Sequence, residues 1–297
     1  MIKRIIEISQ AKTYLSIASG QLVLKRDGSE LARIPCEDIG ILLVDHNAVT
    51  YTHSVFTELL KNRAAVVLCS ADHHPAGMLL PLDSNSTQTE TFRYQINAKA
   101  PLKKRLWQQI VKAKIAHQAK LVKDDLDAYR KLKTLKKKVR SGDPDNIEAQ
   151  ASRVFWPVFV NDVQFRRDIN GLPPNNILNY GYTVLRAAIA RALCCAGLLP
   201  TLGIHHRNKY NAFCLADDLI EPFRGFVEAR VRDIYDTLDS EGQLDQSKKA
   251  AILETLNDNV TISGYTGPLM VGLHRTAASL QKCFAGKQDK LELPRID

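Results

Sequence analysis

The stretch Asp83-Ser84-Asn85-Ser86-Thr87-Gln88-Thr89 is polar, has no apolar periodicity, and divides the sequence into two parts with different patterns. Before it, short apolar runs alternate with turn residues, a pattern typical of β-strands. After it, apolar residues recur every three or four positions, a pattern typical of amphipathic helices. We therefore expect an α+β protein with a small β-rich domain at 1–82, a linker at 83–98 and a larger all-α domain at 99–297.

The part before this stretch predicts a β-meander, two buried strands and one helix. Ala18-Ser19-Gly20 and Asp27-Gly28 are turn signals between short runs of strand-forming residues. The continuous apolar runs at 39–44 and 64–69 predict buried strands, and residues 52–62 between them predict a crossover helix.

The part after the stretch predicts several helices. A stripe on one face of a long, lysine-rich helix is formed by Leu102, Leu106, Ile110, Ala113, His117 and Leu121. Residues 176–196 are apolar on several sides and end at Gly197, so we expect them to form the buried centre of this domain. Further helices are expected at 215–238 and 245–257, followed by a loop at 263–268 and a C-terminal helix.

Composition excludes several protein classes. The six cysteines form no CxxC pair and several lie in apolar runs, which indicates reduced, buried thiols in the cytosol. The chain has neither the apolar core of a signal peptide nor a stretch of about 18 uncharged apolar residues. We therefore expect a cytoplasmic protein without a membrane partner.

The positive charge is concentrated in one region. The formal net charge is +9, and residues 99–140 hold fifteen Lys or Arg against three Asp. Such asymmetry favours a polyanionic partner such as DNA, although a solvated helix face explains it as well. The sequence has no GxGxxG, GxxxxGK[ST], GxSxG, HExxH or Cys-His zinc pattern, which leaves a hard-cation site as the remaining chemistry.

Three segments supply candidate ligands for such a cation. Glu148 lies beside the inward stripe of a helix that Asp143 is expected to cap, with Pro144 in the first turn. His205 and His206 lie in a loop that leaves the central helix. Asp218 and Glu221, three residues apart, share a helix face, whereas the neighbouring Asp217 points elsewhere.

Each segment has an ordinary structural explanation. Glu148 could keep its carboxylate in water at the edge of the core, the histidines could lie on the surface or in the core, and acids in a first helical turn complement the helix dipole. Together, however, two carboxylates and one imidazole form a ligand set suited to Mg²⁺ or Mn²⁺. A cation held in this way can activate a hydroxyl for attack on a phosphodiester.

Four blocks of the sequence resemble, in order, the motif blocks of the CRISPR-associated integrase family, the universal adaptation protein "one". They are NIEAQA (146–151), NNILNYGY (175–182), GLLPTLGIHH (197–206) and LADDLIEPFR (215–224). The double histidine and the insertion at 207–213 resemble most the type II branch of this family. The resemblance implies Glu148, His206 and Glu221 as metal ligands and Asp218 as a supporting catalytic carboxylate, with His205 and Asp217 as neighbouring alternatives.

The resemblance also implies a reaction and partners. The family's members are Mg²⁺- or Mn²⁺-dependent DNA endonucleases and integrases, in which a prespacer 3′-hydroxyl attacks a phosphodiester at the border of a CRISPR repeat. Implied partners are double-stranded DNA, a second copy of the chain bound through the β-rich domain, the small CRISPR-associated protein "two", and the type II effector nuclease with its accessory protein. Our candidates for phosphate contact are Lys103, Lys104, Arg105, Lys112, Lys136, Lys137 and Lys138.

Two other functions fit the same residues. A plain metal-dependent DNA endonuclease would use water in place of the 3′-hydroxyl at the same site. A non-catalytic DNA-binding scaffold would use the acids and histidines only structurally.

Overall fold

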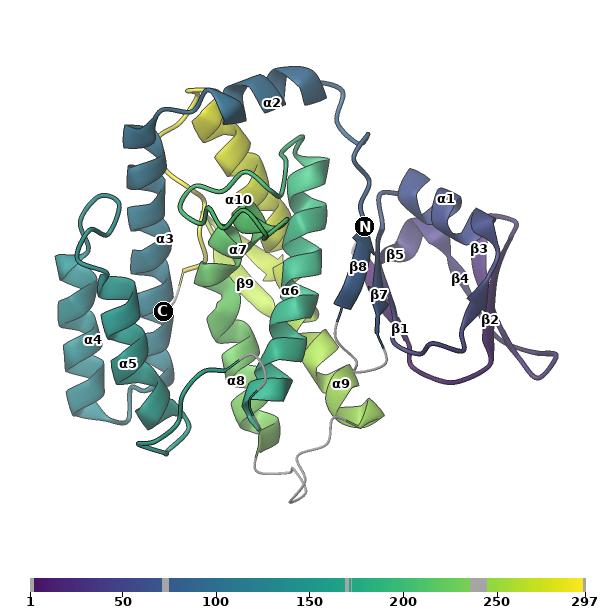
Figure 1. Ribbon diagram of the computed structural model, residues 1–297, viewed down its shortest axis with the longest axis horizontal. Coiled ribbons are helices and arrows are strands. Elements are labelled where there is room, and N and C mark those ends of the chain that lie inside the picture. Colours follow the sequence, from purple (N-terminus) through teal and green to yellow (C-terminus); the bar gives the residue numbers. More distant parts are fainter. Residues whose placement is uncertain (1–2, 71–74, 169–170, 172, 236–244, 296–297) are drawn as a thin grey trace.

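The computed structural model describes residues 3–70, 75–168, 171, 173–235 and 245–295, and it shows a β-rich part followed by a helical part (Figure 1). One of the two four-stranded sheets of the β-rich part has the strand order β4-β3-β2-β6. Strands β2, β3 and β4 are antiparallel neighbours, which confirms the predicted meander. The bounds are β2 (Thr13–Ala18), β3 (Gln21–Arg26), β4 (Ser29–Pro35) and β6 (Thr50–Tyr51).

The second sheet contains the predicted buried strands in the order β1-β5-β7-β8. Strands β1, β5 and β7 are parallel, and a connection between parallel strands has to cross over the sheet. Helix α1 (His53–Lys61) lies in that connection between β5 and β7, as the sequence predicts. The strands are β1 (Arg4–Ile8), β5 (Ile39–Val44), β7 (Ala65–Cys69) and β8 (Pro75–Leu79).

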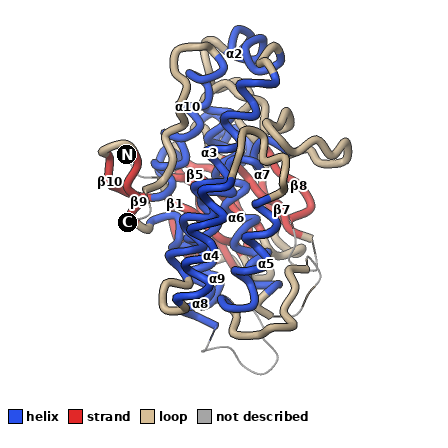
Figure 2. The backbone as a smooth tube through the Cα atoms, turned by 90° about the vertical axis from the view of Figure 1, so that its left-hand side faces the viewer, coloured by secondary structure: helices blue, strands red, loops and turns tan. Residues whose placement is uncertain are grey.

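The side chains of β5 alternate between two hydrophobic cores, and so β5 packs against both parts of the molecule. Leu42 and Val44 pack into the core of the β-rich part, whereas Ile41 and Leu43 point to the opposite face and belong to the helical core. In Figure 2, which views the molecule from the helical side, the sheets of the β-rich part lie behind the helices. The second sheet is therefore covered by the meander on one face and by helices on the other.

The helical part is built around α6, which runs from Asn175 to Cys195 and is buried over most of its length. Gly197 adopts a φ of 78° just beyond its end, which confirms the predicted left-handed stop. Helices α3, α4 and α5 pack against one another on the side away from the β-rich part (Figure 1). The remaining bounds are α2 (Gln88–Ile96), α3 (Ala100–Leu121), α4 (Leu126–Lys138), α5 (Ile147–Phe159), α7 (Cys214–Ile220), α8 (Arg224–Tyr235), α9 (Gln246–Leu253) and α10 (Leu269–Phe284).

Two segments differ from the sequence prediction. Most of the expected linker is helix α2, and Gln95 of this helix hydrogen-bonds the backbone of Leu199 and Leu202, which fixes it to the helical part. The expected loop at 263–268 contains the second strand of a hairpin formed by β9 (Asn259–Ile262) and β10 (Tyr265–Pro268). The helical part is thus not purely α-helical.

The cysteines and the helix lengths can be compared with what the composition predicts. All six cysteines are free thiols, and Cys36, Cys194, Cys214 and Cys283 are buried. Among the described residues, no helix is long and apolar enough to span a membrane.

Candidate active site

Helix α5 positions Glu148 in its first turn. Asn146, in the left-handed region with a φ of 51°, is the N-cap residue, and the carboxylate of Asp143 accepts hydrogen bonds from the backbone of Ile147 and Glu148 at 2.9 Å each. Asp143 therefore does satisfy the free amides of the helix start, as expected. Pro144, however, precedes the helix and does not lie in its first turn, because α5 begins only at Ile147.

A helix break positions Glu221. The sequence predicts one helix over 215–238, but α7 ends at Ile220, a 3₁₀ turn covers Glu221–Phe223, and α8 starts at Arg224. Pro222 explains the break, since proline lacks the amide hydrogen that a continuing α-helix requires. The predicted end of this helix, at 236–238, lies outside the described residues. The turn places the Glu221 carboxylate in the interior, where its side chain is 7% exposed.

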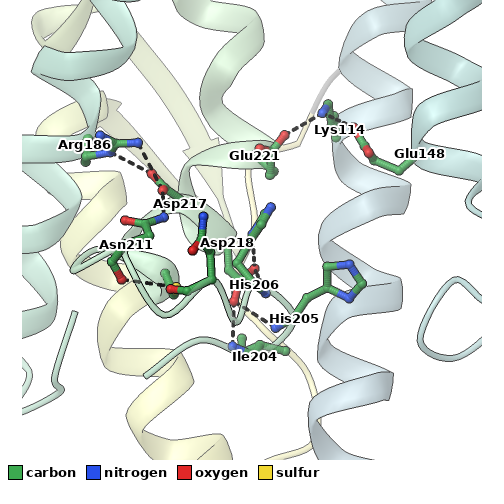
Figure 3. Close-up of polar contacts among 12 residues, drawn as sticks. Lys114, Glu148, Arg186, Ile204, His205, His206, Asn211, Asp217, Asp218 and Glu221 are labelled. Atoms are coloured by element: carbon green, nitrogen blue, oxygen red, sulfur yellow. Dashed lines mark hydrogen bonds and ion pairs between the residues drawn. The ribbon is translucent and has the colours of Figure 1, made fainter. Parts of the chain in front are cut away.

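Lys114 of α3 joins the two glutamates (Figure 3). Its ammonium contacts Glu148 Oε1 and lies 2.6 Å from Glu221 Oε2, while Arg224 donates to Glu221 Oε1 at 2.9 Å. Burial alone would raise the pKa of Glu221, but Arg224 and Lys114 outweigh it and lower the pKa to about 2. Because both carboxylates contact one nitrogen, their nearest oxygens are separated by no more than two hydrogen-bond lengths, about 6 Å.

Asp218 organises the histidine loop. Its carboxylate, 0% exposed, accepts hydrogen bonds from the backbone N–H groups of Ile204, His205 and His206. It also lies 2.7 Å from His206 Nδ1. This hydrogen bond raises the pKa of His206 and leaves Nε2 as the nitrogen available to a ligand. Gly203 is needed here, because a Cβ would lie 2.3 Å from the carbonyl oxygen of His206.

The two neighbouring alternatives have other partners. The imidazole of His205 stacks on the buried Trp107 ring at 4.2 Å. Asp217 receives two hydrogen bonds from Arg186, at 2.7 and 3.0 Å, and one from Asn211. Figure 3 shows this cluster apart from the Lys114 contacts. The structure thus brings together Glu148 and Glu221, links Asp218 to His206, and leaves Asp217 in a separate ion pair.

A cavity of about 830 Å³ adjoins these residues. Glu148, His206 and Glu221 line it together with Lys114. One further acid, Glu228, lines the cavity and accepts a hydrogen bond from Tyr182. The other walls are largely basic and aromatic, and include Arg153, Arg166, Arg167, Arg224, Trp156, Phe165 and Tyr182. The Arg167 guanidinium lies over the rings of Trp156 and Tyr182, at 5.5 and 5.4 Å from their centres. Such a wall suits an anion that also carries flat apolar groups.

The predicted phosphate contacts lie elsewhere. None of the seven Lys and Arg candidates lines this cavity; they lie on α3 and on the last turn of α4. Of these, Lys104, Arg105, Lys137 and Lys138 are exposed. The cavity arginines and Lys114 are absent from the prediction. Lys114 follows Ile110 by four residues and so lies on the buried face of α3, a signal that could have identified it.

The donor set fits a divalent cation in part. Two carboxylates converge from separate segments on one cationic group, and the imidazole of His206 on the same cavity uses Nδ1, and not Nε2, for its hydrogen bond to Asp218. Oxygen donors with one imidazole suit Mg²⁺ or Mn²⁺. Within the described residues, however, no three His, Cys, Asp or Glu side chains lie close enough to surround an ion. Ligation by all three residues therefore requires a local rearrangement.

Comparison with known proteins gives a family match over most of the chain. The family model described as CRISPR associated protein Cas1 matches residues 6–254. The chain is 34% identical to the CRISPR-associated endonuclease Cas1 of Neisseria meningitidis serogroup C over 286 residues, which cover 95% of this chain and 93% of that relative.

Several solved structures share the fold, and two of them are similar over nearly the whole of this chain. A casposase bound to integration product has a TM-score of 0.79 at 19% identity, covering 97% of this chain and 92% of that one. A chain of a Cas6-RT-Cas1–Cas2 complex has a TM-score of 0.77 at 18% identity, covering 98% of this chain and 36% of that one. From the family match over most of its length, the chain belongs to the Cas1 family of CRISPR-associated proteins.

Proposed function

We propose that this chain is a Mg²⁺- or Mn²⁺-dependent DNA integrase of CRISPR adaptation. It would insert prespacer DNA into a repeat array by attack of a 3′-hydroxyl on a phosphodiester. The observation that carries the proposal is the convergence of Glu148 and Glu221 on one cationic group beside His206 and an arginine-lined cavity. Supporting it, one relative is named an endonuclease and one structural neighbour is a casposase bound to integration product.

Each site residue then has a stated role. Glu148, Glu221 and His206 Nε2 would hold the ion, and Asp218 orients His206 through Nδ1. Mg²⁺ or Mn²⁺, when bound, polarises a phosphate oxygen and lowers the pKa of the attacking hydroxyl. Arg153, Arg166 and Arg167 neutralise phosphates in the cavity, and Arg224 keeps Glu221 ionised.

The proposal includes partners. A second copy of the chain, bound through the β-rich part, and the small CRISPR-associated protein "two" would complete the integration complex. The naming of Cas1 with Cas2 in a solved neighbouring complex supports the second partner. The type II effector nuclease and its accessory protein remain further proposed partners, on the resemblance of the double histidine and the insertion at 207–213 to the type II branch.

A strand-joining assay tests the function. The chain, with its small partner protein, is incubated with a labelled duplex bearing 3′-hydroxyl ends and a plasmid carrying a repeat. We expect label joined to the plasmid in Mn²⁺ or Mg²⁺ and none in a chelator. Duplexes with 3′-deoxy ends serve as the control, since they lack the nucleophile. Cleavage of the plasmid without joining would instead identify a plain endonuclease.

Salt dependence separates the two groups of basic residues. Affinity falls as salt rises, and each lost phosphate contact reduces the steepness of that fall, in log affinity against log salt, by about 0.9. We expect the triple change of Lys136, Lys137 and Lys138 to Ala to weaken DNA binding but to preserve joining at saturating DNA, since these residues lie outside the cavity. Arg166→Ala should reduce joining even when the DNA is saturating.

Fluorescence anisotropy at several NaCl concentrations, together with the joining assay, measures both effects. An unchanged salt slope in the triple variant would remove α4 from the DNA-binding surface.

A further inference from the structure

Lys114 is a basic residue in a place where an amphipathic helix normally carries an apolar one. Its neighbours on the same face of α3, Ile110 and Val111, are buried, and the Lys114 side chain is only 11% exposed. A lysine is rarely buried to this extent unless it is paired. Its pairing is with the two glutamates that the proposed function assigns to the metal.

The pairing offsets the electrostatic repulsion between the carboxylates of Glu148 and Glu221. Glu148 comes from α5 and Glu221 from the turn after α7, so no local chain geometry forces them together. Two carboxylates that approach each other in a partly dry site repel strongly unless a cation lies between them. Arg224 offsets only one of them, through Glu221 Oε1. Lys114 contacts the other oxygen of Glu221 as well as Glu148, and so neutralises the pair as a bound ion would.

We propose that Lys114 is a built-in substitute for the divalent ion: in the metal-free protein its ammonium occupies the place between Glu148 and Glu221, and metal binding requires it to leave. This inference rests on the proposed function. It also explains why the described residues include no closed set of three ligands. The carboxylate oxygens are spaced for hydrogen bonds to an ammonium, which are longer than metal–oxygen bonds. They can approach a metal ion only after Lys114 has moved away.

The surroundings allow the exchange. An ammonium at hydrogen-bonding distance and a metal ion about 2.1 Å from the same oxygens cannot share one position. The four-carbon stem of lysine is flexible, and the cavity of about 830 Å³ is open beside it. Arg153, Arg166 and Arg167 line this space, so a displaced ammonium would join a cationic wall. A DNA phosphate is the counter-ion that such a wall recruits.

Mn²⁺ titration of the full chain tests the inference. The wild type, Lys114→Met, Lys114→Gln and Lys114→Arg are titrated with Mn²⁺ alone, and free Mn²⁺ is followed by electron paramagnetic resonance. We expect the Met and Gln variants to bind Mn²⁺ about tenfold or more tightly than the wild type, because the competing charge-assisted contacts are gone. The Arg variant, which keeps a competing charge, should not show this gain.

Thermal unfolding gives a second measurement. In the absence of metal the Met variant should unfold at a lower temperature than the wild type, because the two carboxylates are left facing each other. Saturating Mn²⁺ should raise its unfolding temperature more than that of the wild type. A gain in affinity cannot arise from misfolding, since loss of structure only weakens binding.

The outcomes separate this inference from the function on which it rests. Equal or weaker Mn²⁺ binding by Lys114→Met, with binding still abolished by Glu148→Ala, overturns the role of Lys114 but keeps the metal site. If neither the wild type nor Lys114→Met binds Mn²⁺ in a manner that depends on Glu148, the metal site fails and the inference fails with it.

Discussion

Glu148→Ala is expected to lower the rate of DNA strand joining by about 10³-fold or more, the consequence of losing several kcal/mol of transition-state charge stabilisation. Glu148 is the only acid of α5 and one of the two carboxylates that meet at Lys114. Its removal leaves Glu221 as the one remaining carboxylate of the two proposed as metal ligands. The rate is measured from joined product at saturating Mn²⁺ and DNA.

Asp145→Ala is the matched control for this variant. Asp145 lies just before α5, is 45% exposed and pairs with Arg140, and it does not line the cavity. We expect near-normal joining by the control and nearly unchanged DNA affinity in both variants. Joining by Glu148→Ala at the wild-type rate would remove Glu148 from the catalytic set.

Asp218→Ala is expected to reduce both stability and activity. The carboxylate is fully buried and accepts three backbone hydrogen bonds and the His206 contact, so its removal leaves several buried donors unpaired. We expect the free energy of unfolding to fall by about 3–5 kcal/mol, as for breaking a buried, hydrogen-bonded charge pair. Urea denaturation measures this loss, and the joining assay measures the effect of an unrestrained His206.

The adjacent Asp217 provides the control. Asp217→Ala also breaks an ion pair, between Asp217, whose side chain is 9% exposed, and the more exposed Arg186, but this pair lies apart from His206 and Lys114. We expect Asp217→Ala to lose stability while keeping joining activity under conditions where it is folded. If both variants lose joining equally at matched stability, the role of Asp218 in positioning His206 is refuted.

The fold was predictable where the local signal and the tertiary environment agree. The turns at Asp27-Gly28 and the stop at Gly197 follow from backbone conformations that glycine adopts readily, and each lies where the sequence predicts it. The run 39–44 was predictable as a strand, but its alternation between two cores was not, because both of its faces are apolar.

The errors have equally local causes. Helix α2 is not predicted by the sequence because its composition is polar and it lacks an apolar stripe. It is held to the helical part by the hydrogen bonds of Gln95. The helix break at Pro222 was overlooked because the flanking residues keep a helical pattern. The β9–β10 hairpin turns at Ser263-Gly264. A turn signal of this kind fits a plain loop as well as a hairpin, so the sequence alone does not predict the second strand.

The site was predictable as residue types but not as geometry. Sequence motifs select Glu148, His206, Asp218 and Glu221, yet the contact between Glu148 and Glu221 through Lys114 joins segments distant in sequence. The arginines of the cavity follow no periodic pattern, so only the tertiary structure identifies them. Charge density alone selected the lysines of α4, which lie outside the cavity.

Anomalous diffraction from crystals of this chain grown with Mn²⁺ tests whether Glu148, Glu221 and His206 hold one ion. We predict one strong peak within about 2.5 Å of carboxylate oxygens of Glu148 and Glu221 and of His206 Nε2, with the Lys114 ammonium moved into the cavity. The metal site and the displacement of Lys114 would both be refuted if crystals with saturating Mn²⁺ showed no peak at these atoms and Lys114 still bridged the two glutamates.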